Sequence, residues 1–242
     1  MCNARSDQVQ EVVIVGLRLT LVGMSGAGKT YWSRKLAQRG FKRFGCDDRI
    51  ARKLRPEFSS SDGMERGMGD WMGFPYEEGY RERASKYLKQ EIETLKEIIA
   101  YLETGSDRNQ EDIVVDTTGS VVYTGEDIIL KLKQHTTVIY LPAPVEAQNH
   151  MFTAYLSKKG PMIWNNLFDK RLDETNEEAL ARCYRELISF REERYQRYAD
   201  VTIDYYKRVS KGFEVPEFLR EVVKANKEQW INVDHCDRNP VS

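Results

Sequence analysis

The octapeptide at residues 23–30, Gly-Met-Ser-Gly-Ala-Gly-Lys-Thr, constrains the fold of this chain more than any other feature. It fits the phosphate-binding loop pattern G-x-x-x-x-G-K-[ST] at every fixed position. An apolar run at residues 19–22 precedes it, and a segment of helical character follows it from Tyr31. Glycines let the backbone curl so that its N–H groups converge on phosphate oxygens, and the following helix adds the positive end of its dipole. The complete motif in this context favours a nucleoside triphosphate site over a chance Gly-rich turn.

Two side chains of the loop have specific expected roles. We expect Lys29 to reach the β- and γ-phosphates and to neutralise charge that develops during catalysis, and the Thr30 hydroxyl to bind Mg²⁺. ATP and Mg²⁺ are therefore the predicted cofactors. The residues expected to contact the nucleotide are Gly23, Ser25, Gly26, Ala27, Gly28, Lys29 and Thr30.

Length and composition fit either one large α/β domain or one domain with an insertion, because 242 residues with 40% apolar and 31% charged side chains suit a globular protein with a substantial core. The formal net charge of −1 and the lack of a long Lys/Arg run argue against a nucleic-acid partner. The four cysteines have no metal-ligand spacing, which argues against zinc and a disulfide framework and favours a reducing compartment. They are Cys2, Cys46, Cys183 and Cys236.

No apolar stretch reaches membrane-spanning length, and the polar residues 1–11 do not form a signal-peptide core. We therefore expect a cytoplasmic protein without a membrane partner. The expected partners are a nucleoside triphosphate and a small anionic substrate, and the expected assembly is a monomer or a homodimer.

Five β-rich apolar runs alternate with helical stretches along the chain. The runs lie at 18–22, 41–45, 112–115, 136–141 and 200–203, and the helical stretches at 31–39, 77–103, 126–134, 145–156 and 176–198. Near-continuous apolar runs are typical of strands buried on both faces of a parallel sheet, and strands alternating with helices imply βαβ units. The prediction is a three-layer α/β fold in which a five-stranded parallel sheet is flanked by helices and the nucleotide lies at the carboxyl ends of the strands.

The expected organisation has three parts. Residues 1–17 form an N-terminal extension, residues 18–210 a P-loop domain, and residues 211–242 a C-terminal helix and tail. Within the domain, residues 56–79 show no clean period and predict a substrate-side insertion. Residues 156–174 are loop-like between helical stretches, and a long loop in a phosphotransferase is a candidate lid.

Carboxylates follow two of the predicted strands. Asp47 and Asp48 come just after the second strand, where they could hold Mg²⁺ through water, accept a hydroxyl proton or bind a polyol; the alternative is a solvated pair that caps the next helix. Asp116 ends the third strand in a Walker-B-like arrangement that would orient Mg²⁺. The alternative there is a turn of small polar residues. Residues expected to contact substrate beside Asp116 are Thr117, Thr118 and Gly119.

Two arginines complete the candidate site. Arg81 begins the long middle helix, from which its guanidinium could fork onto a carboxylate or phosphate. Arg191 lies three residues before Arg194 on one helix face, near Tyr195. Taken alone, both arginines are better explained as part of a solvated, charged helix face than as part of a site.

The order of these motifs resembles the shikimate kinase family. Its pattern runs from a phosphate loop to an acidic D-x-D, an F-R-x-x-E helix start, a glycine triplet, a lid, and R-x-x-x-Y before A-D-x-x-[IV]. Residues 23–30 fit the first motif, residues 79–83 (Gly-Tyr-Arg-Glu-Arg) are similar to the helix start, and Arg191 through Tyr195 leading to Ala199-Asp200 fits the last. The resemblance covers about residues 18–205 and implies a P-loop kinase fold.

This resemblance assigns roles to individual residues. It implies that Arg81 binds a substrate carboxylate, that Arg191 is the second substrate arginine, and that Asp47, by its spacing to Ile50, contacts substrate hydroxyls and acts as the base or orienter. Asp48 takes that role if the register shifts by one residue. Asp116 or Asp47 would help Thr30 to hold Mg²⁺ through water.

The chain departs from the family pattern at three places. Residues 116–120 (Asp-Thr-Thr-Gly-Ser) replace the glycine triplet, and Gly45 or Cys46 replaces the first acid of D-x-D. Gly160-Pro161 replaces the Arg-Pro pair of the lid. The basic residues that could substitute for the lid arginine are Lys158, Lys159 and Arg171.

The expected activity is transfer of the ATP γ-phosphoryl group to a hydroxyl of a small anionic acceptor, with shikimate as one candidate. Kinases of another hydroxy acid, a sugar or a nucleotide are alternatives within the same class. A nucleotide-binding pseudo-kinase with an interaction or regulatory role is the alternative outside it. A GTPase switch is disfavoured because residues 226–229 (Asn-Lys-Glu-Gln) follow no strand and lack the Asp that reads guanine.

Overall fold

The computed structural model describes residues 16–58, 67–104, 111–158 and 160–236. Most of the predicted N-terminal extension therefore lies outside the described residues, as do Cys2, Lys159 and part of the predicted insertion at 56–79. The side chain of Lys158 also lies outside them, so the structure does not place two of the candidate substitutes for the lid arginine. Among the described residues, no helix is long and apolar enough to span a membrane.

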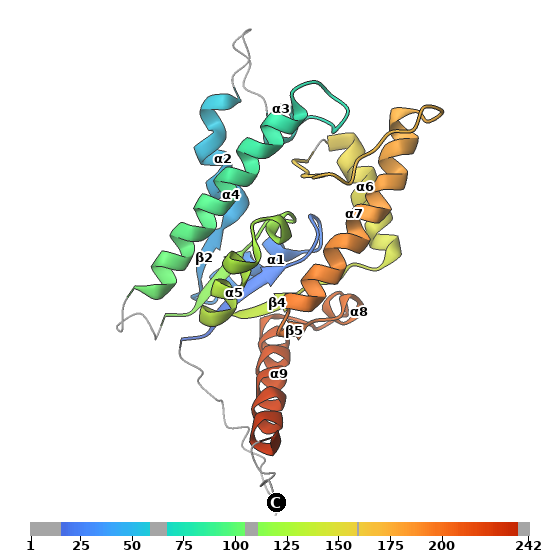
Figure 1. Cartoon of the computed structure of the whole chain (residues 1–242). Coiled ribbons are helices and arrows are strands. Elements are labelled where there is room, and N and C mark those ends of the chain that lie inside the picture. The colour runs from blue at the N-terminus through green and yellow to red at the C-terminus, as the bar shows by residue number, and fades with distance from the viewer. Residues whose placement is uncertain (1–15, 59–66, 105–110, 159, 237–242) are drawn as a thin grey trace, which may run out of the picture.

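A parallel five-stranded sheet forms the centre of the fold (Figure 1). The strand order is β2-β3-β1-β4-β5, so the chain begins in the middle of the sheet and crosses over between neighbours. The strands are β1 (Arg18–Val22), β2 (Lys42–Gly45), β3 (Ile113–Asp116), β4 (Thr137–Tyr140) and β5 (Val201–Thr202). The predicted five-stranded parallel sheet is confirmed, each strand overlapping its predicted apolar run.

Helices join the strands as the alternating pattern predicts, although the helix after β2 was not among the predicted helical stretches. The longest helix after the sheet extends further than the sequence suggested, reaching Cys236. The helices are α1 (Lys29–Ala37), α2 (Cys46–Leu54), α3 (Met68–Met72), α4 (Tyr80–Glu103), α5 (Glu126–His135), α6 (Val145–Lys158), α7 (Asn176–Tyr198), α8 (Tyr205–Arg208) and α9 (Val215–Cys236), with short 3₁₀ turns at Arg55–Glu57 and Val121–Tyr123.

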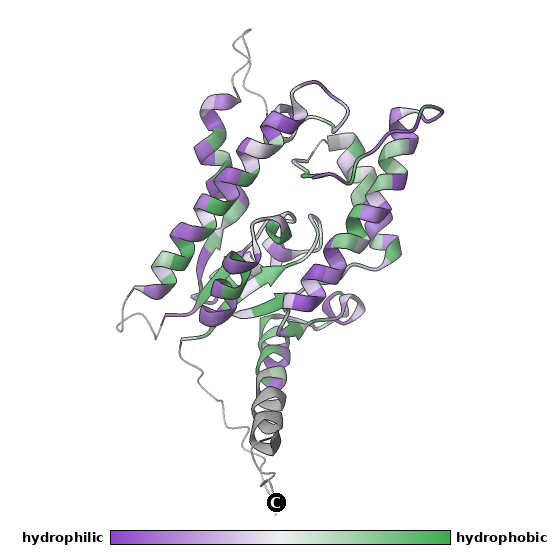
Figure 2. Ribbon diagram, viewed as in Figure 1, coloured by the Kyte–Doolittle hydropathy of each residue, from purple (hydrophilic) through white to green (hydrophobic). Residues whose placement is uncertain are grey.

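The sheet is buried on both faces, which gives the fold its three layers. Leu19 and Leu21 of β1 point into one apolar cluster that contains Trp32 of α1 and Phe218 of α9. The alternate residue Val22 joins a larger cluster built mainly from α2, α4, α5 and α7. The hydrophobic colour concentrated on the strands reflects this two-sided burial (Figure 2). Burial on both faces explains why the strand sequences are nearly continuous apolar runs.

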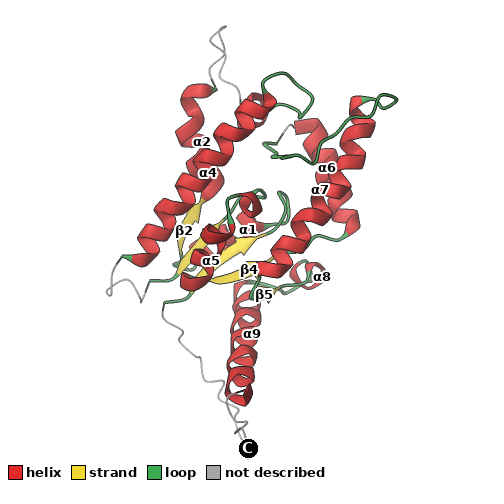
Figure 3. Ribbon diagram, in the orientation of Figure 1, coloured by secondary structure: helices red, strands yellow, loops and turns green. Residues whose placement is uncertain are grey.

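The sheet register brings the predicted site motifs to one edge. Leu21 of β1 and Gly45 of β2 both lie opposite Asp116 of β3, and Val22 lies opposite Tyr140 of β4. Because the strands are parallel, the segments that leave their carboxyl ends begin side by side. Loop segments gather at this edge (Figure 3), between α2 and α4 on one side and α6 and α7 on the other (Figure 1).

Candidate functional site

The phosphate loop leaves the end of β1 and runs into α1. Gly23 has a φ of 145°, and a Cβ atom there would lie 2.7 Å from the carbonyl oxygen of Leu141. Gly28 precedes α1 with a φ of 93°, in the left-handed region. A residue with a side chain would be strained at both positions, so glycine is required by the turn itself. The loop is thereby folded with Ser25 and Gly26 exposed at its tip.

Lys29 is the first residue of α1 and is almost fully buried, with 5% exposure. Its Nζ donates hydrogen bonds to the carbonyl oxygens of Gly23 (2.8 Å) and Met24 (2.9 Å). Burial lowers the pKa of Lys29, and the carboxylates of Asp47 and Asp116 oppose this effect. The ammonium group is therefore held inside the loop that it is predicted to serve, at the position where phosphates would enter.

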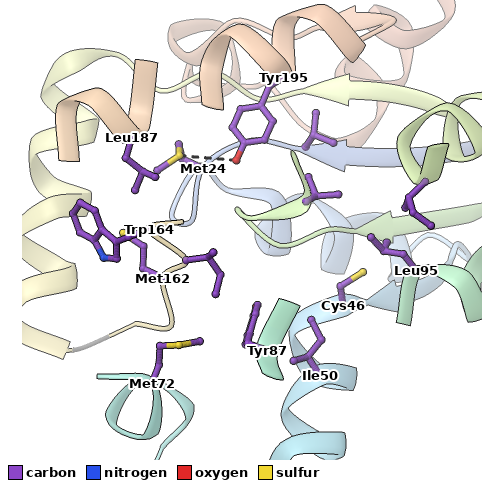
Figure 4. Packing of buried hydrophobic residues seen from close by; sticks show 14 of the residues in the cluster. Met24, Cys46, Ile50, Met72, Tyr87, Leu95, Met162, Trp164, Leu187 and Tyr195 are labelled. Atoms are coloured by element: carbon purple, nitrogen blue, oxygen red, sulfur yellow. Dashed lines mark hydrogen bonds between the residues drawn. The ribbon is translucent and has the colours of Figure 1, made fainter. Parts of the chain in front are cut away.

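A cavity of about 240 Å³ lies beside the loop. Its polar lining comes from five separate segments of the chain: Ser25, Asp47, Tyr87, Gly119, Ser120 and Arg191. Its remaining walls are Met68, Pro161, Met162 and Ile163. Figure 4 shows Tyr87 and Met162 in this region, with Met24 of the loop pointing toward Tyr195. Three predicted elements thus meet at one cavity: the phosphate loop, the second-strand carboxylate and the α7 arginine.

Arg191 brings a buried positive charge to the cavity. Its side chain is only 1% exposed. Nη2 donates to the carbonyl oxygen of Ile163, and Nε contacts the Tyr123 hydroxyl at 3.3 Å. Among the described residues, no carboxylate lies within 4.0 Å of the guanidinium. Because a guanidinium stays protonated even when buried, this charge is held by neutral hydrogen-bond partners, while the carboxyl group of Glu91 lies near enough to interact with it through space.

Asp47 and Asp48 have different partners in the structure. This difference distinguishes between the two residues as candidates for the contact with substrate hydroxyls. Asp47 lines the cavity and accepts a hydrogen bond from the Tyr87 hydroxyl at 3.0 Å. Asp47 is an exposed residue, yet desolvation by the surrounding protein raises the pKa of its carboxylate. Asp48 is exposed and forms an ion pair with Arg43 at 2.8 Å. Only Asp47 has access to a molecule in the cavity.

The turn after β3 contributes fewer contacts than expected. Gly119 lines the cavity, but neither Thr117 nor Thr118 is part of its lining. The Thr117 hydroxyl donates to the carbonyl oxygen of Leu21 at 2.6 Å, and the Thr118 hydroxyl bonds to Glu91. Both hydroxyls thus bond to protein partners in this structure, and substrate contact by Thr117 and Thr118 stays a prediction. Ser120, which was not predicted, lines the cavity in their place.

Glu91 is a functional candidate that the sequence reasoning missed. It is fully buried on α4, and its second carboxylate oxygen accepts a hydrogen bond from the Ser120 hydroxyl at 2.6 Å. Burial is the main cause that raises the pKa of Glu91 to about 7. The helical spacing of Tyr80, Tyr87, Glu91 and Leu95, all buried, could have revealed it as a carboxylate on an apolar helix face.

Arg81 does not join this site. It is exposed near the start of α4, and it is not part of the cavity lining. The neighbouring Tyr80 points inward instead, donating to the carbonyl oxygen of Met162 and accepting from the N–H of Trp164, both at 2.8 Å. Adjacent helix residues project about 100° apart, so an inward Tyr80 leaves Arg81 on the flank. Arg81 therefore lies outside the cavity lining, and carboxylate binding by Arg81 stays a prediction.

Asp116 is buried at the end of β3 and already has protein partners. Its Oδ2 accepts from Arg43 Nη2 (2.7 Å) and from the Ser33 hydroxyl (2.9 Å). Its Oδ1 is buried without any hydrogen-bond partner. No group of three or more metal-binding side chains occurs among the described residues. The Ser33 hydroxyl contacts both the carbonyl oxygen of Thr30 and Oδ2 of Asp116, so the two residues share a neighbour on α1. The orphaned Oδ1 fits a single contact to Mg²⁺ or to its water shell, and no larger ligand set.

The predicted lid at 156–174 begins in α6 and continues as an irregular segment. Met162, Ile163 and Trp164 are buried, and Trp164 Nε1 donates to the Tyr155 hydroxyl at 3.1 Å. Pro161 to Ile163 thus form a wall of the cavity that is anchored by the neighbouring indole. Arg171 is exposed and outside the cavity lining, so the described residues hold no basic side chain from this segment at the cavity.

Comparisons with known proteins point to one family. A curated shikimate kinase from Nitrosomonas europaea is 26% identical over 213 residues, which are 87% of this chain and 80% of that protein. The structure of shikimate kinase from Acinetobacter baumannii in complex with shikimate is 23% identical, covers 90% of this chain and 94% of the other, and has a TM-score of 0.53. Shikimate kinase from Bacteroides thetaiotaomicron is 14% identical, with 90% and 98% coverage and a TM-score of 0.50.

No protein-family model matches the chain. The sequence and fold likenesses agree with each other and with the motif order, although the identities are low. The chain is therefore a divergent, shikimate kinase-like protein with a P-loop fold.

Proposed function

We propose that this chain is an ATP-dependent kinase that transfers the γ-phosphoryl group to a hydroxyl of a small anionic acceptor. The observation that carries the proposal is one cavity beside the phosphate loop that is lined by both a buried arginine and an accessible carboxylate, Arg191 and Asp47. The likeness to shikimate kinases supports the reaction class and makes shikimate the first acceptor to test.

Arg191 supports the anionic nature of the acceptor. Burial of a charge without an opposite charge costs several kcal/mol in proteins. A ligand carboxylate in the cavity would offset this cost and could accept two parallel N–H bonds from the guanidinium. A neutral polyol would leave the guanidinium with neutral hydrogen-bond partners only. The cavity is thus built to favour an acid over an alcohol of similar size.

Asp47 supplies the proton acceptor in the proposed reaction. The acceptor hydroxyl oxygen forms a bond to the γ-phosphorus while the bond from that phosphorus to the β–γ bridging oxygen breaks, and ADP leaves. The hydroxyl proton passes to the Asp47 carboxylate, whose raised pKa makes it a better base than an ordinary aspartate. The Tyr87 hydroxyl, at 3.0 Å, holds that carboxylate in position.

The donor side acts through positioning and charge. Lys29 would exchange its two carbonyl partners for phosphate oxygens, and the loop N–H groups would bind the same anion. Thr30 and Oδ1 of Asp116 are the groups that would hold Mg²⁺ or its water, and Mg²⁺ supplies charge neutralisation on the phosphates when bound. The segment at 156–174 would act as the lid, because its residues 161–163 form a cavity wall.

The test is ADP release with a panel of acceptors. Shikimate and other hydroxylated carboxylic acids are compared with polyols that lack the carboxylate. We expect turnover only with the acids. Lys29→Met should abolish turnover in a folded protein, and Asp47→Asn should reduce kcat far more than acceptor binding.

Arg191→Gln isolates acceptor recognition. It should raise the acceptor KM by about 10- to 100-fold, the value expected for losing a charge-assisted hydrogen bond, while nucleotide binding stays unchanged. Arg197→Gln is the matched control, because Arg197 lies on the same helix but is exposed and paired with Glu126. An unchanged KM in Arg191→Gln would refute anion recognition by this residue.

A nucleotide-binding pseudo-kinase is the second candidate. The specific observation in its favour is that Arg191 is the sole basic residue of the described cavity lining, with none contributed by residues 160–174 of the lid segment. Transition-state charge on the transferred group would find no cation among those described lid residues. Tight ATP binding without a phosphorylated product from any acceptor would select this candidate over the kinase.

A further inference from the structure

A half-buried arginine on β2 forms ion pairs with a buried carboxylate of β3 and an exposed carboxylate of α2, beside the phosphate-loop helix. Arg43 donates from Nη2 to Asp116 Oδ2 (2.7 Å), from Nη1 to Asp48 Oδ2 (2.8 Å) and from Nε to the Ser33 hydroxyl (2.8 Å). Ser33 in turn donates to the same Asp116 oxygen at 2.9 Å. The guanidinium thus bridges two carboxylates and one hydroxyl. These are oxygen ligands of the kind that a hard divalent cation also binds.

Gly45 makes room for this arrangement. It lies opposite Asp116 in the sheet register. A Cβ atom at Gly45 would lie 2.6 Å from Asp48 Oδ2 and 2.7 Å from both terminal nitrogens of Arg43. Any side chain at this position would displace the guanidinium from Asp116. The absence of a side chain at the end of β2 therefore lets Arg43 lie next to Asp116, the carboxylate that the sequence predicts to bind metal.

The two oxygens of Asp116 are unequal as a result. Oδ2 is saturated by Arg43 and Ser33, whereas Oδ1 is buried and has no partner. Asp116 itself is 3% exposed, and Lys29 lies close enough for its pKa to respond to the Asp116 charge. A cation at the phosphate loop would find one oxygen of Asp116 free and a positive charge fixed on the other.

We propose that Arg43 determines how strongly the nucleotide site binds its divalent metal: the guanidinium occupies half of Asp116 and repels a second cation. This inference rests on the proposed nucleotide site. The Arg43 guanidinium and a metal ion at Oδ1 of Asp116 would be separated by little more than one carboxylate group. At such a short distance the repulsion between a unit charge and a divalent cation is substantial, even with strong dielectric screening. Nucleotide binding in the wild type should accordingly depend only weakly on metal.

The experiment measures metal binding directly. Mn²⁺ is titrated by electron paramagnetic resonance in the presence of saturating ADP, and the affinity for a fluorescent ADP analogue is measured with and without Mn²⁺. Arg43→Gln should tighten Mn²⁺ binding to the ADP complex by about fivefold or more, because it removes the repelling charge. Arg43→Lys keeps the charge and should resemble the wild type. Arg39→Gln, an exposed substitution with the same charge change, should leave the Mn²⁺ affinity unaltered.

A second pair of variants covers the case in which Arg43→Gln fails to fold because Asp116 is left as an unpaired buried carboxylate. Asp116→Asn and the double variant Arg43→Gln/Asp116→Asn contain no such carboxylate. The double variant should bind Mn²⁺ more tightly than Asp116→Asn alone, since only the guanidinium differs in charge. Equal or weaker binding after removal of Arg43, in either background, would overturn the inference.

The same titration separates this inference from the proposed function. If the ADP analogue binds and the Mn²⁺ affinity does not respond to Arg43, the role of Arg43 is refuted and the nucleotide site stands. If the folded wild-type protein binds no nucleotide under either condition, the proposed function fails and the metal inference fails with it.

Discussion

Replacing Glu91 with glutamine tests whether this residue is protonated in the buried polar cluster beside the cavity. The hydroxyls of Thr118 and Ser120 each contact one oxygen of Glu91 and contact each other at 2.9 Å, and Thr118 also accepts the N–H of Ser120. Three contacts among three side chains need three protons, of which the hydroxyls supply two. A protonated Glu91 supplies the third and closes the ring. Glutamine preserves this pattern, because its amide donates where the protonated carboxyl would.

The magnitude of the effect follows from the raised pKa. Burial moves the pKa of Glu91 from its ordinary value of 4.5 to about 7, which corresponds to about 3 kcal/mol. Between these two values the unfolded chain releases the proton while the folded protein keeps it. The folded state therefore binds more protons, and its stability falls as pH rises through this window. Glu91 should cost the wild type about 2–3 kcal/mol between pH 5 and pH 8.

Other charged groups near Glu91 also shape the measured curve, so the comparison must be made against a variant. Asp47 opposes ionisation of Glu91 and Arg191 favours it, while Lys29 lies close enough for its own pKa to respond to Glu91. Because Glu91→Gln leaves these groups in place, the difference between the wild-type and variant curves isolates the carboxyl group to first order.

The assay is urea unfolding at pH 5, 6, 7 and 8 for both proteins. The variant should gain stability relative to the wild type as pH rises, with a total change of about 2–3 kcal/mol across the range. Glu93→Gln, on the same helix but outside the cluster, is the matched control and should give a curve parallel to the wild type. Parallel curves for Glu91→Gln and the wild type would refute a raised pKa at this position.

Three further substitutions probe the walls of the site. Gly119→Ala places a Cβ atom 2.9 Å from the backbone nitrogen of Ser25, and should destabilise the fold by about 1–3 kcal/mol and weaken nucleotide binding, as thermal unfolding and a fluorescent-nucleotide titration would show. Trp164→Ala removes a fully buried indole and should cost about 3–5 kcal/mol in urea unfolding. Tyr80→Phe removes the hydroxyl that ties residues 162 and 164 to α4, and should cost about 1–3 kcal/mol and speed proteolysis within 160–175. Unchanged stability in any of the three would contradict the packing described for that residue.

Much of the fold was predictable because its signals are local. The phosphate loop ties a strand to a helix within residues 18–37, and the apolar runs mark strands that are buried on both faces. Thr175 and Glu178 form a capping box that starts α7 where the helical pattern begins. Parallel pairing then follows from the alternation of strands and helices. The strand order was not predictable in the same way, because the crossovers between β2, β3 and β1 depend on how whole layers pack.

The site was less predictable because its pairings are long-range. Arg43 meets Asp116 across 73 residues, and Thr118 meets Glu91 across 27. No local sequence pattern predicts such a pair, because a charged residue on a strand or helix is solvated far more often than it is buried. Arg81 is a different case: the resemblance assigns it to a substrate carboxylate, whereas its helical position next to the inward-pointing Tyr80 leaves it on the surface.

Two departures from the shikimate kinase pattern are coupled by the sheet register. With Asp47 as the cavity carboxylate, the resemblance aligns the first acid of the D-x-D pattern with Gly45, at the end of β2. Asp116, at the end of β3, stands directly opposite Gly45. Compared with that pattern, this chain has its carboxylate on the neighbouring strand, and Arg43 occupies space that a side chain at position 45 would need. An acid at position 45 alone would therefore bring three carboxylates, its own and those of Asp48 and Asp116, around the guanidinium of Arg43. We expect a stably folded variant only when Asp116 is neutralised in the same protein.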